Sequence, residues 1–323
     1  MRHRYTFRAV DAGDGSDGRW AQAALAVWDK TMSWFGGERS PEEAAHARQL
    51  FDSHLPELVP VRDQLAARLA GAGAPVAEVG AAMTQTVFRP LFSGCTQSAT
   101  GGALVRNYDF HPDVCEGTVV RSHFLRPVLG TQDSGWGLLD GVNDAGLAVS
   151  LTFGGRPAFR PGLSIVIIVR YLLETCDTVG QALGTLGSLP FATAHNLTLV
   201  DRTGAAATVH TGPDIGVVRT SDGCAANHQH TPVPAEQERV TRTGERLAAI
   251  RAAAEAGAPD AVVAALLRPP LYSTAYEDHL GTLYTADYRP AEGSVTYHWP
   301  GESAWRQSLD SFRPGERTVT LGG

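Results

Sequence analysis

The sequence lacks several features that would assign it to common classes of protein. It has no apolar run of about 18 residues, the length that predicts a membrane-spanning helix, and its N-terminus leads into no apolar segment typical of a signal peptide. No block of basic residues stands out, and the net charge is −7 at pH 7. We therefore expect neither a membrane nor a nucleic acid as a partner.

Cysteine is also scarce, with 4 in 323 residues and no paired spacing among Cys95, Cys115, Cys176 and Cys224. This pattern argues against a zinc site and a disulfide framework, and it predicts a reducing, cytoplasmic setting. His228 and His230 stand two apart on a predicted strand, but no third ligand is suitably spaced. The sequence predicts no metal and no cofactor.

The composition is that of a folded chain, with 43% hydrophobic and 19% charged residues. That length and composition suit one large domain or two modest ones with a substantial core. The first 94 residues are predicted to be mostly helical. After a strand at residues 5–10, helices are expected at 20–34, from the Ser40 cap to 53, from about 59 to 71, and at 76–88.

Beyond residue 95 the pattern changes to strands and turns, with a few helices between them. Strands are expected at 102–108, 117–125, 194–201, 205–210, 216–219, 224–228, 280–288 and 293–298, and a hairpin at 137–151. Helices are expected at 179–187, 236–256 and 259–267. The segment 164–176 is ambiguous, because its β-branched run favours a buried strand while its length favours a buried helix.

The shift occurs around Gly94 and Cys95, which a strand-like run connects to Arg106 and Asp109. A thiol is a poor nucleophile until it loses its proton. If a cut before Cys95 made it a chain terminus, its own α-amine could act as the base. Gly94 has no side chain to block the approach of that thiol to its carbonyl carbon.

The two charged residues fit the same chemistry. A guanidinium at Arg106 would lower the pKa of a neighbouring thiol, and a carboxylate at Asp109 would hold the new ammonium. Plain alternatives remain open at this point. A cysteine is more often a small buried hydrophobic residue, and Arg106 with Asp109 could be an ordinary ion pair.

Three further motifs follow in order. Asn143 lies in the run Asp-Gly-Val-Asn-Asp-Ala-Gly-Leu, Asn196 lies in His-Asn-Leu-Thr-Leu-Val-Asp, and Arg246 follows Thr243 on a predicted helix. Each has an ordinary structural interpretation: turn chemistry for Asn143, a satisfied strand end for Asn196 and a solvated helix position for Arg246.

Together with Gly94-Cys95, these motifs resemble the isopenicillin N acyltransferase-like family of N-terminal-nucleophile hydrolases, relatives of the choloylglycine hydrolases. The resemblance implies an α+β fold, a four-layer αββα sandwich of two stacked antiparallel sheets. It implies a helical leader at residues 1–94, a catalytic domain at residues 95–323, and a helix rather than a strand at 164–176.

The resemblance also implies roles. Cys95 would be the nucleophile after cleavage between Gly94 and Cys95, with Arg106 and Asp109 beside it. Asn196, with Asn143, would hold the oxyanion. Arg246 would reach the site, with Arg242 as a competitor, and Asn227-His228 resembles a segment that is structural or lines the substrate pocket.

The implied partner is a small acyl amide or acyl thioester. The resemblance leaves open whether water or an acceptor amine takes the acyl group. It also leaves open whether the cleaved chains form a heterodimer and whether copies of the protein associate.

Two rival hypotheses remain. In the first, an unprocessed homologue of the same fold keeps Cys95 internal and acts as a binding protein, or as an enzyme with His111 or His195 as base. In the second, the chain is a papain-like hydrolase with a Cys–His pair, although the usual sequence around such a nucleophile is missing.

Overall fold

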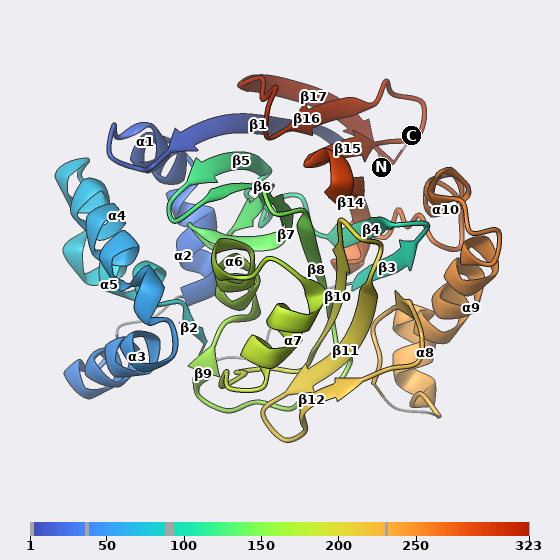
Figure 1. The fold of residues 1–323 in the computed structure, drawn as a ribbon, viewed down its shortest axis with the longest axis horizontal. Coiled ribbons are helices and arrows are strands. Elements are labelled where there is room, and N and C mark those ends of the chain that lie inside the picture. Colours follow the sequence, from blue (N-terminus) through green and yellow to red (C-terminus); the bar gives the residue numbers. More distant parts are fainter. Residues whose placement is uncertain (1–2, 36–38, 88–93, 230–231, 323) are drawn as a thin grey trace.

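Two large sheets form the centre of the chain in this computed structural model, which describes residues 3–35, 39–87, 94–229 and 232–322 (Figure 1). In the described residues, the first sheet has nine strands in the order β12-β11-β10-β8-β7-β6-β5-β1-β17, and the second has six in the order β13-β3-β4-β14-β15-β16. Neighbouring strands are antiparallel in both sheets, apart from the parallel pair β1 and β5.

The strand bounds are as follows. The nine-stranded sheet contains β1 (His3–Gly13), β5 (Thr118–His123), β6 (Pro127–Asp133), β7 (Gly137–Asn143), β8 (Leu147–Phe153), β10 (His195–Asp201), β11 (Ala206–Gly212), β12 (Gly216–Arg219) and β17 (Gly315–Leu321). The six-stranded sheet contains β3 (Gly94–Thr100), β4 (Ala103–Phe110), β13 (Cys224–Ala225), β14 (Gly281–Arg289), β15 (Ser294–His298) and β16 (Trp305–Ser308). A small separate pair joins β2 (Thr86–Val87) and β9 (Gly162–Leu163).

The sheets stack face to face, with β3 and β4 against β8 and β10. The helices α6 (Ile165–Thr175) and α7 (Val179–Leu186) cover the outer face of the larger sheet, and α9 (Thr243–Ala254) and α10 (Pro259–Leu266) cover that of the smaller sheet (Figure 1). The predicted four-layer αββα sandwich is confirmed.

Alternation along β4 explains these layers. Leu104 and Tyr108 point into the core between the sheets, whereas Ala103 and Val105 pack in a second core with Ile250 of α9 and other residues of the helical layer. Because successive side chains of a strand point to opposite faces, one strand serves both cores.

The N-terminal segment contains the predicted helices: α1 (Arg19–Leu25), α2 (Trp28–Phe35), α3 (Pro41–His54), α4 (Val59–Gly71) and α5 (Val76–Thr84). Ser40 caps α3 as predicted. Its hydroxyl accepts the Glu43 N–H at 3.2 Å, and the Glu43 carboxylate accepts the Ser40 N–H at 2.8 Å. The same segment supplies β1, so it shares a sheet with the rest of the chain.

The ambiguous segment is the helix α6. Ser164 caps its first turn by accepting the Ile167 N–H at 3.4 Å, and the helix is buried on nearly every side. In this position a β-branched run stabilises a helix by packing, which outweighs its weak helix propensity.

Three predicted helices were too long. The helix expected at 20–34 breaks between α1 and α2, where the Val27 N–H bonds back only three residues, to Ala24. The helix expected at 76–88 ends at Thr84, because Gln85 adopts a left-handed φ of 50°. Residue 88 lies outside the described residues.

The helix expected at 236–256 is two helices, α8 (Ala235–Thr241) and α9. Arg242 separates them with a left-handed φ of 49°. Val240, near the end of α8, is 48% exposed because the break removes it from the face that α9 buries. The strand expected at 224–228 covers only Cys224–Ala225.

Candidate active site

The hairpin of β3 and β4 brings the ends of the cysteine motif together. Two glycines at residues 101–102 make its turn with positive φ values of 55° and 75°, which glycine adopts without steric cost. The resulting register pairs Gly94 with Asp109. Cys95 therefore lies next to a strand that carries both Arg106 and Asp109.

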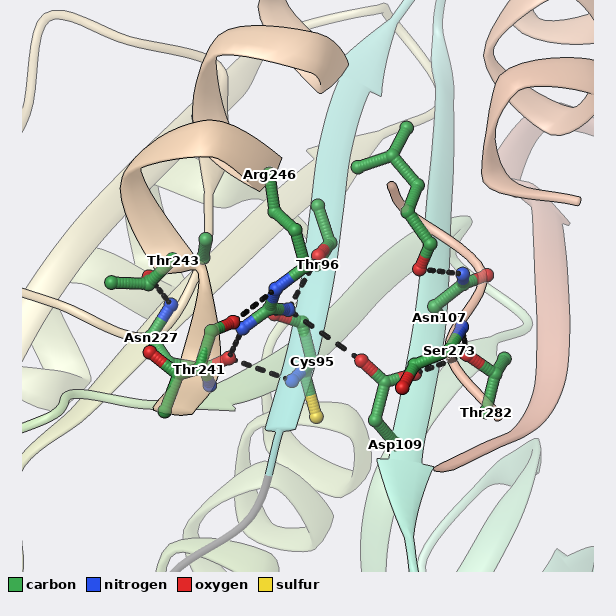
Figure 2. Close-up of polar contacts among 12 residues, drawn as sticks. Cys95, Thr96, Asn107, Asp109, Asn227, Thr241, Thr243, Arg246, Ser273 and Thr282 are labelled. Atoms are coloured by element: carbon green, nitrogen blue, oxygen red, sulfur yellow. Dashed lines mark hydrogen bonds and ion pairs between the residues drawn. The ribbon is translucent and has the colours of Figure 1, made fainter. Parts of the chain in front are cut away.

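Three groups of Cys95 have fixed partners. Its sulfur accepts from Nη2 of Arg106 at 3.0 Å, and its carbonyl oxygen accepts from Nη1 of Arg246 at 2.8 Å. Its backbone N–H donates to Oδ1 of Asn227 at 2.9 Å. Figure 2 shows Arg246 between Asn227 on one side and Asp109 on the other. The structure thus brings Arg106 and Arg246 together at Cys95.

The two arginines reach Cys95 from opposite layers. Arg106 points into the space between the sheets, where its Nη1 donates to Asp140 of β7 at 2.9 Å. Arg246 comes from α9, in the helical layer on the other side of β3. The sulfur and the backbone of Cys95 are consequently polarised by separate cations.

The thiol of Cys95 is fully buried, and burial raises its pKa above the ordinary value. Arg106 opposes that shift, the Asp109 carboxylate adds to it, and the Asp109 backbone N–H and Arg246 again oppose it. Burial wins, so in the uncut chain the thiol keeps its proton near neutral pH. A base is needed before this sulfur can attack.

Asp109 lies on β4, opposite the start of β3, and its carboxylate has two partners. Its Oδ1 accepts from the Thr282 hydroxyl at 2.7 Å, and its Oδ2 lies 3.5 Å from Nη1 of Arg246. Burial raises the pKa of Asp109, while Arg246, Thr282 and Arg106 pull it down. The carboxylate is close to the point where a new ammonium on Cys95 would form.

Asn227 follows β13 and is held on several sides. Its backbone N–H donates to the Thr243 hydroxyl at 2.7 Å, its Nδ2 donates to the Phe153 carbonyl at 3.2 Å, and its Oδ1 also accepts from Arg246 at 2.5 Å. The sequence analysis treated Asn227 as structural or pocket-lining. The Asn-His pair was the available signal, but it did not distinguish Asn227 from the other asparagines.

Asn196, the predicted oxyanion residue, lies behind Asn227. Its Nδ2 donates to the Ala226 carbonyl at 2.7 Å and to the Thr152 hydroxyl at 3.1 Å, and its Oδ1 accepts from Gln229 at 3.1 Å. These bonds use the amide to fix the segment that carries Asn227. The structure places Asn196 as a support for that segment, without a bond to Cys95 among the described contacts.

Asn143, the second predicted oxyanion residue, holds the β7–β8 turn. Its Nδ2 donates to the carbonyls of Leu173 and Cys176 at 2.9 and 2.8 Å, and its Oδ1 accepts from the Leu147 N–H at 2.9 Å. Both N–H donors are thus engaged with carbonyls at the end of α6. Among the described contacts, the Asn143 side chain has none with Cys95, and its part in holding the oxyanion stays a prediction.

Asp140 is a site residue that the sequence analysis missed. It is fully buried, and it accepts bonds from Arg106 and from the hydroxyls of Tyr284 and Tyr288. A carboxylate within an apolar strand must find cationic or hydrogen-bonding partners if it is buried. That rule was the available signal, because Asp140 follows the apolar start of β7.

The choice between the two helix arginines is resolved by geometry. The Arg246 side chain is 5% exposed and contacts Cys95, Asn227 and Asp109. Arg242 is 54% exposed and pairs with Glu245 at 2.7 Å. Because the left-handed residue 242 ends α8, only the arginine one turn further on points at β3.

Neither histidine proposed as a base bonds Cys95 among the described contacts. His195 is buried and its Nδ1 lies 3.1 Å from the Thr193 hydroxyl, and burial lowers its pKa to about 4. His111 accepts the Asp113 N–H at 3.1 Å. The described contacts of His111 and His195 therefore do not form a Cys–His pair with Cys95.

Two negative findings concern the described residues alone. They contain no group of three or more His, Cys, Asp or Glu side chains arranged to hold a metal ion, and His230 lies outside them. None of their helices is both long and apolar enough to cross a membrane.

Two cavities lie beside residues that contact Cys95, and both are lined by Val240 and Thr241 of α8. One of about 290 Å³ is lined by Asp109, Arg242, Arg246, Tyr272, Ser273 and Leu280, among others. The other, of about 320 Å³, is lined by Phe153, Gly155, Asn227 and Gln237 besides the shared residues. Small molecules therefore have space next to Asp109 and Arg246 on one side and next to Asn227 on the other.

Comparisons with known proteins concern the family and the fold of this chain. A family profile described as acyl-coenzyme A:6-aminopenicillanic acid acyl-transferase matches residues 96–304. A search of curated proteins found no significant match. A mutant of the conjugated bile acid hydrolase from Clostridium perfringens has a similar structure, with a TM-score of 0.50, 12% identity and coverage of 71% of this chain and 97% of that chain.

Two other solved structures are similar at lower scores. Penicillin V acylase from Agrobacterium tumefaciens has a TM-score of 0.39 and 13% identity, over 72% of this chain and 86% of that one. The Caenorhabditis elegans N-acylethanolamine-hydrolyzing acid amidase orthologue has a TM-score of 0.46 and 12% identity, over 70% of this chain and 99% of that one. Since the family profile spans well over half of the residues, the chain belongs to the acyl-coenzyme A:6-aminopenicillanic acid acyl-transferase family, within the N-terminal-nucleophile hydrolases.

Proposed function

We propose that this protein is a self-processing cysteine acyltransferase or amidohydrolase that acts on small acyl amides or acyl thioesters. Cleavage between Gly94 and Cys95 would give residues 1–94 and 95–323. Cys95 would then carry the acyl group as a thioester. Family membership supports the reaction class, and the arrangement around Cys95 supports the choice of nucleophile.

The observation that carries the proposal is the set of bonds to the main chain of Cys95. Its N–H donates to Asn227, and its carbonyl oxygen accepts from Arg246. A buried cysteine with only a packing role needs no cation at its sulfur and none at its carbonyl oxygen. Here the nitrogen that would become the free amine already has an acceptor, with the Asp109 carboxylate on the neighbouring strand.

Processing would begin with attack by Sγ of Cys95 on the Gly94 carbonyl carbon. A C–S bond forms, the C–N bond breaks, and the thiol proton ends on the Cys95 nitrogen. Water then cleaves the thioester, which gives a Gly94 carboxylate and a free thiol. Asn227 and Asp109 would hold the new ammonium by charge-assisted bonds.

Turnover repeats this chemistry on a substrate. The α-amine of Cys95 takes the thiol proton, the sulfur attacks the acyl carbon, and the proton passes to the leaving amine. The resulting thioester is resolved by water or by an acceptor amine. Asn227 is our candidate for positioning the α-amine, because its Oδ1 accepts from the Cys95 nitrogen.

The two cavities suggest how a substrate would be divided. Phe153 and Val240 line the cavity beside Asn227 and would contact the apolar part of an acyl group. Asp109, Arg246 and Ser273 line the other cavity and offer polar contacts to the amine part. This division suits a small amide with one apolar and one polar end.

The experiment that tests the proposal is an intact mass measurement of the purified, denatured protein. Two fragments that meet between Gly94 and Cys95 are expected, and Cys95→Ala should leave one chain of 34.3 kDa. Cys176→Ala is the matched control, since Cys176 is also buried but lies at the end of α6. A wild-type chain that stays intact, or a Cys95→Ala chain that still cleaves, would refute self-processing by Cys95.

A further inference from the structure

The carboxylate of Asp140 lies directly behind the Arg106 guanidinium. Its Oδ2 accepts from Nη1 of Arg106 at 2.9 Å and from the Tyr284 hydroxyl at 2.7 Å. Its Oδ1 accepts from the Tyr288 hydroxyl at 2.5 Å and from the Thr131 N–H at 3.4 Å. Neither charged side chain has any exposed surface.

The two terminal nitrogens of the Arg106 guanidinium bond to different partners. Nη1 faces Asp140 and the Leu139 carbonyl, while Nη2 faces the sulfur of Cys95 at 3.0 Å. The rings of Tyr108 and Tyr284 lie 5.1 and 5.9 Å from the guanidinium carbon. Packed between rings and bonded at both ends, the cation has one orientation available.

We propose that Asp140 is a positioning residue for the chemistry of Cys95: it neutralises the inner end of the Arg106 guanidinium, so that the cation orients the sulfur without capturing it as a permanent thiolate. The proposal rests on the proposed function, since it concerns how the nucleophile of that reaction is kept ready. Asp140 touches neither the sulfur nor a substrate, and it acts through Arg106.

The physical argument concerns the partners of a buried cation. A fully buried guanidinium without a counterion is strongly destabilised, and a nearby thiol that lost its proton would relieve that cost. With Asp140 in place, Arg106 already has an anion. The thiol proton then stays available for transfer to the α-amine of Cys95.

The other titratable groups around this cluster do not supply the same charge. Asp109 of β4 and Arg246 of α9 face Cys95 but oppose each other in their effect on the thiol. Tyr284 and Tyr288 of β14 and Tyr297 of β15 face Asp140, and burial raises the pKa of each of them. They remain neutral donors, so Asp140 is the anion that balances Arg106.

The test is a pH titration of the Cys95 thiol. NMR monitors it in protein labelled with [13Cβ]cysteine, and the Cys95→Ser variant identifies the Cys95 signal. In Asp140→Asn, the isosteric amide removes the negative charge, and the apparent pKa of Cys95 should fall by about one unit. In Tyr288→Phe, the carboxylate loses a donor and attracts Arg106 more strongly. The apparent pKa should then rise by a few tenths of a unit.

Glu174→Gln is the matched control. Arg170 and Glu174 form a second fully buried ion pair at 3.2 Å, on α6, and its partners do not include Cys95. This variant should lose stability as Asp140→Asn does, while the Cys95 titration stays unchanged. General structural damage therefore cannot imitate the expected result.

The outcomes are separable. An unchanged or raised apparent pKa in Asp140→Asn would overturn the proposal. If Asp140→Asn does not fold, Tyr288→Phe decides alone, and an unchanged or lowered pKa would overturn it. The titration needs neither cleavage nor turnover. If the protein never cleaves itself but the variants show the expected pKa shifts, the proposed function is refuted and the role of Asp140 beside Arg106 still stands.

Discussion

The side-chain oxygen of Asn227 lies 2.9 Å from the backbone nitrogen of Cys95, across 132 positions of sequence. This nitrogen is the atom that cleavage would turn into an amine. The same oxygen of Asn227 also accepts a hydrogen bond from Arg246, and Arg246 donates to the Cys95 carbonyl oxygen. Asn227 therefore links the nitrogen that would become the base to the cation at the Cys95 carbonyl.

Replacement of Asn227 tests that relationship. Asn227→Ala removes the acceptor from the Cys95 N–H and a partner from Arg246. Processing and turnover should therefore fall, by at most the roughly 10²–10⁴ that a positioned base contributes. The rate of appearance of the two fragments, followed by mass spectrometry, measures the first. Acyl release from a small amide, in whatever fraction is cleaved, measures the second.

Asn143→Ala is the matched control for Asn227→Ala. It removes the side chain that bonds the Leu173 and Cys176 carbonyls, so unfolding should become easier by about 1–3 kcal/mol. Processing at a temperature where the variant stays folded should match wild type. A folded Asn143→Ala protein that had lost its activity would instead give Asn143 a part in the reaction.

The two arginines of the α8–α9 junction should differ sharply in stability. Arg246→Ala leaves the buried Asp109 carboxylate without its cation, and breaking such a pair costs about 3–5 kcal/mol. Arg242→Ala removes a 54% exposed partner of Glu245 and should cost about 0–1 kcal/mol. Denaturant unfolding, with both variants placed in a Cys95→Ala background, compares uncut chains. Equal losses would contradict the assignment of Arg246 as the inner residue.

Gly94 should tolerate no side chain without consequences for cleavage. A Cβ at this position would lie 3.0 Å from Cδ2 of Leu280 and 3.1 Å from Cβ of Asp109, so Gly94→Ala must push one of them away. Processing should slow at least severalfold, and adding Leu280→Ala should restore part of the rate. Gly80→Ala, where a Cβ meets nothing within 4 Å, is the control. An unchanged rate of processing in Gly94→Ala would contradict this prediction and would show that Leu280 and Asp109 move aside at little cost.

His195 should make the fold sensitive to mild acid. Burial lowers its pKa to about 4, from 6.5, so the unfolded chain binds a proton that the folded chain does not between those values. Stability should therefore fall as pH drops from about 6.5 to 4, by up to about 3 kcal/mol in total. His195→Gln should flatten this part of the curve of unfolding free energy against pH. A variant curve parallel to wild type would mean that His195 does not cause the slope.

Patterns that depend on local chemistry were predicted well from the sequence. Apolar alternation located β4, β7 and β8, and the Ser40 cap located the start of α3. The sandwich itself came from resemblance, because alternation shows that strands exist without showing which of them pair. β1 pairs with β17, about 300 residues later in the sequence, and no pattern in either strand predicts this pairing.

Two of the three over-long predicted helices share one physical cause. Gln85 and Arg242 adopt left-handed backbone conformations that tertiary contacts impose, and neither residue type predicts them. The same limit applies to the site. Asn143, Asn196 and Asn227 all sit in plausible motifs, and only the register of β3 against β13 shows which amide faces Cys95. Asp140 could have been found by asking what pairs with a carboxylate in a buried strand.

The position of β1 has a consequence for how the protein is made. β1 leaves the ribosome long before β17, which completes one of its edges through pairs such as His3 with Leu321. At typical synthesis rates the intervening chain takes on the order of 15–60 s to appear. During that interval β1 presents an unpaired edge, a known template for association with other chains. Newborn molecules are thus most in need of chaperone protection until β17 has emerged.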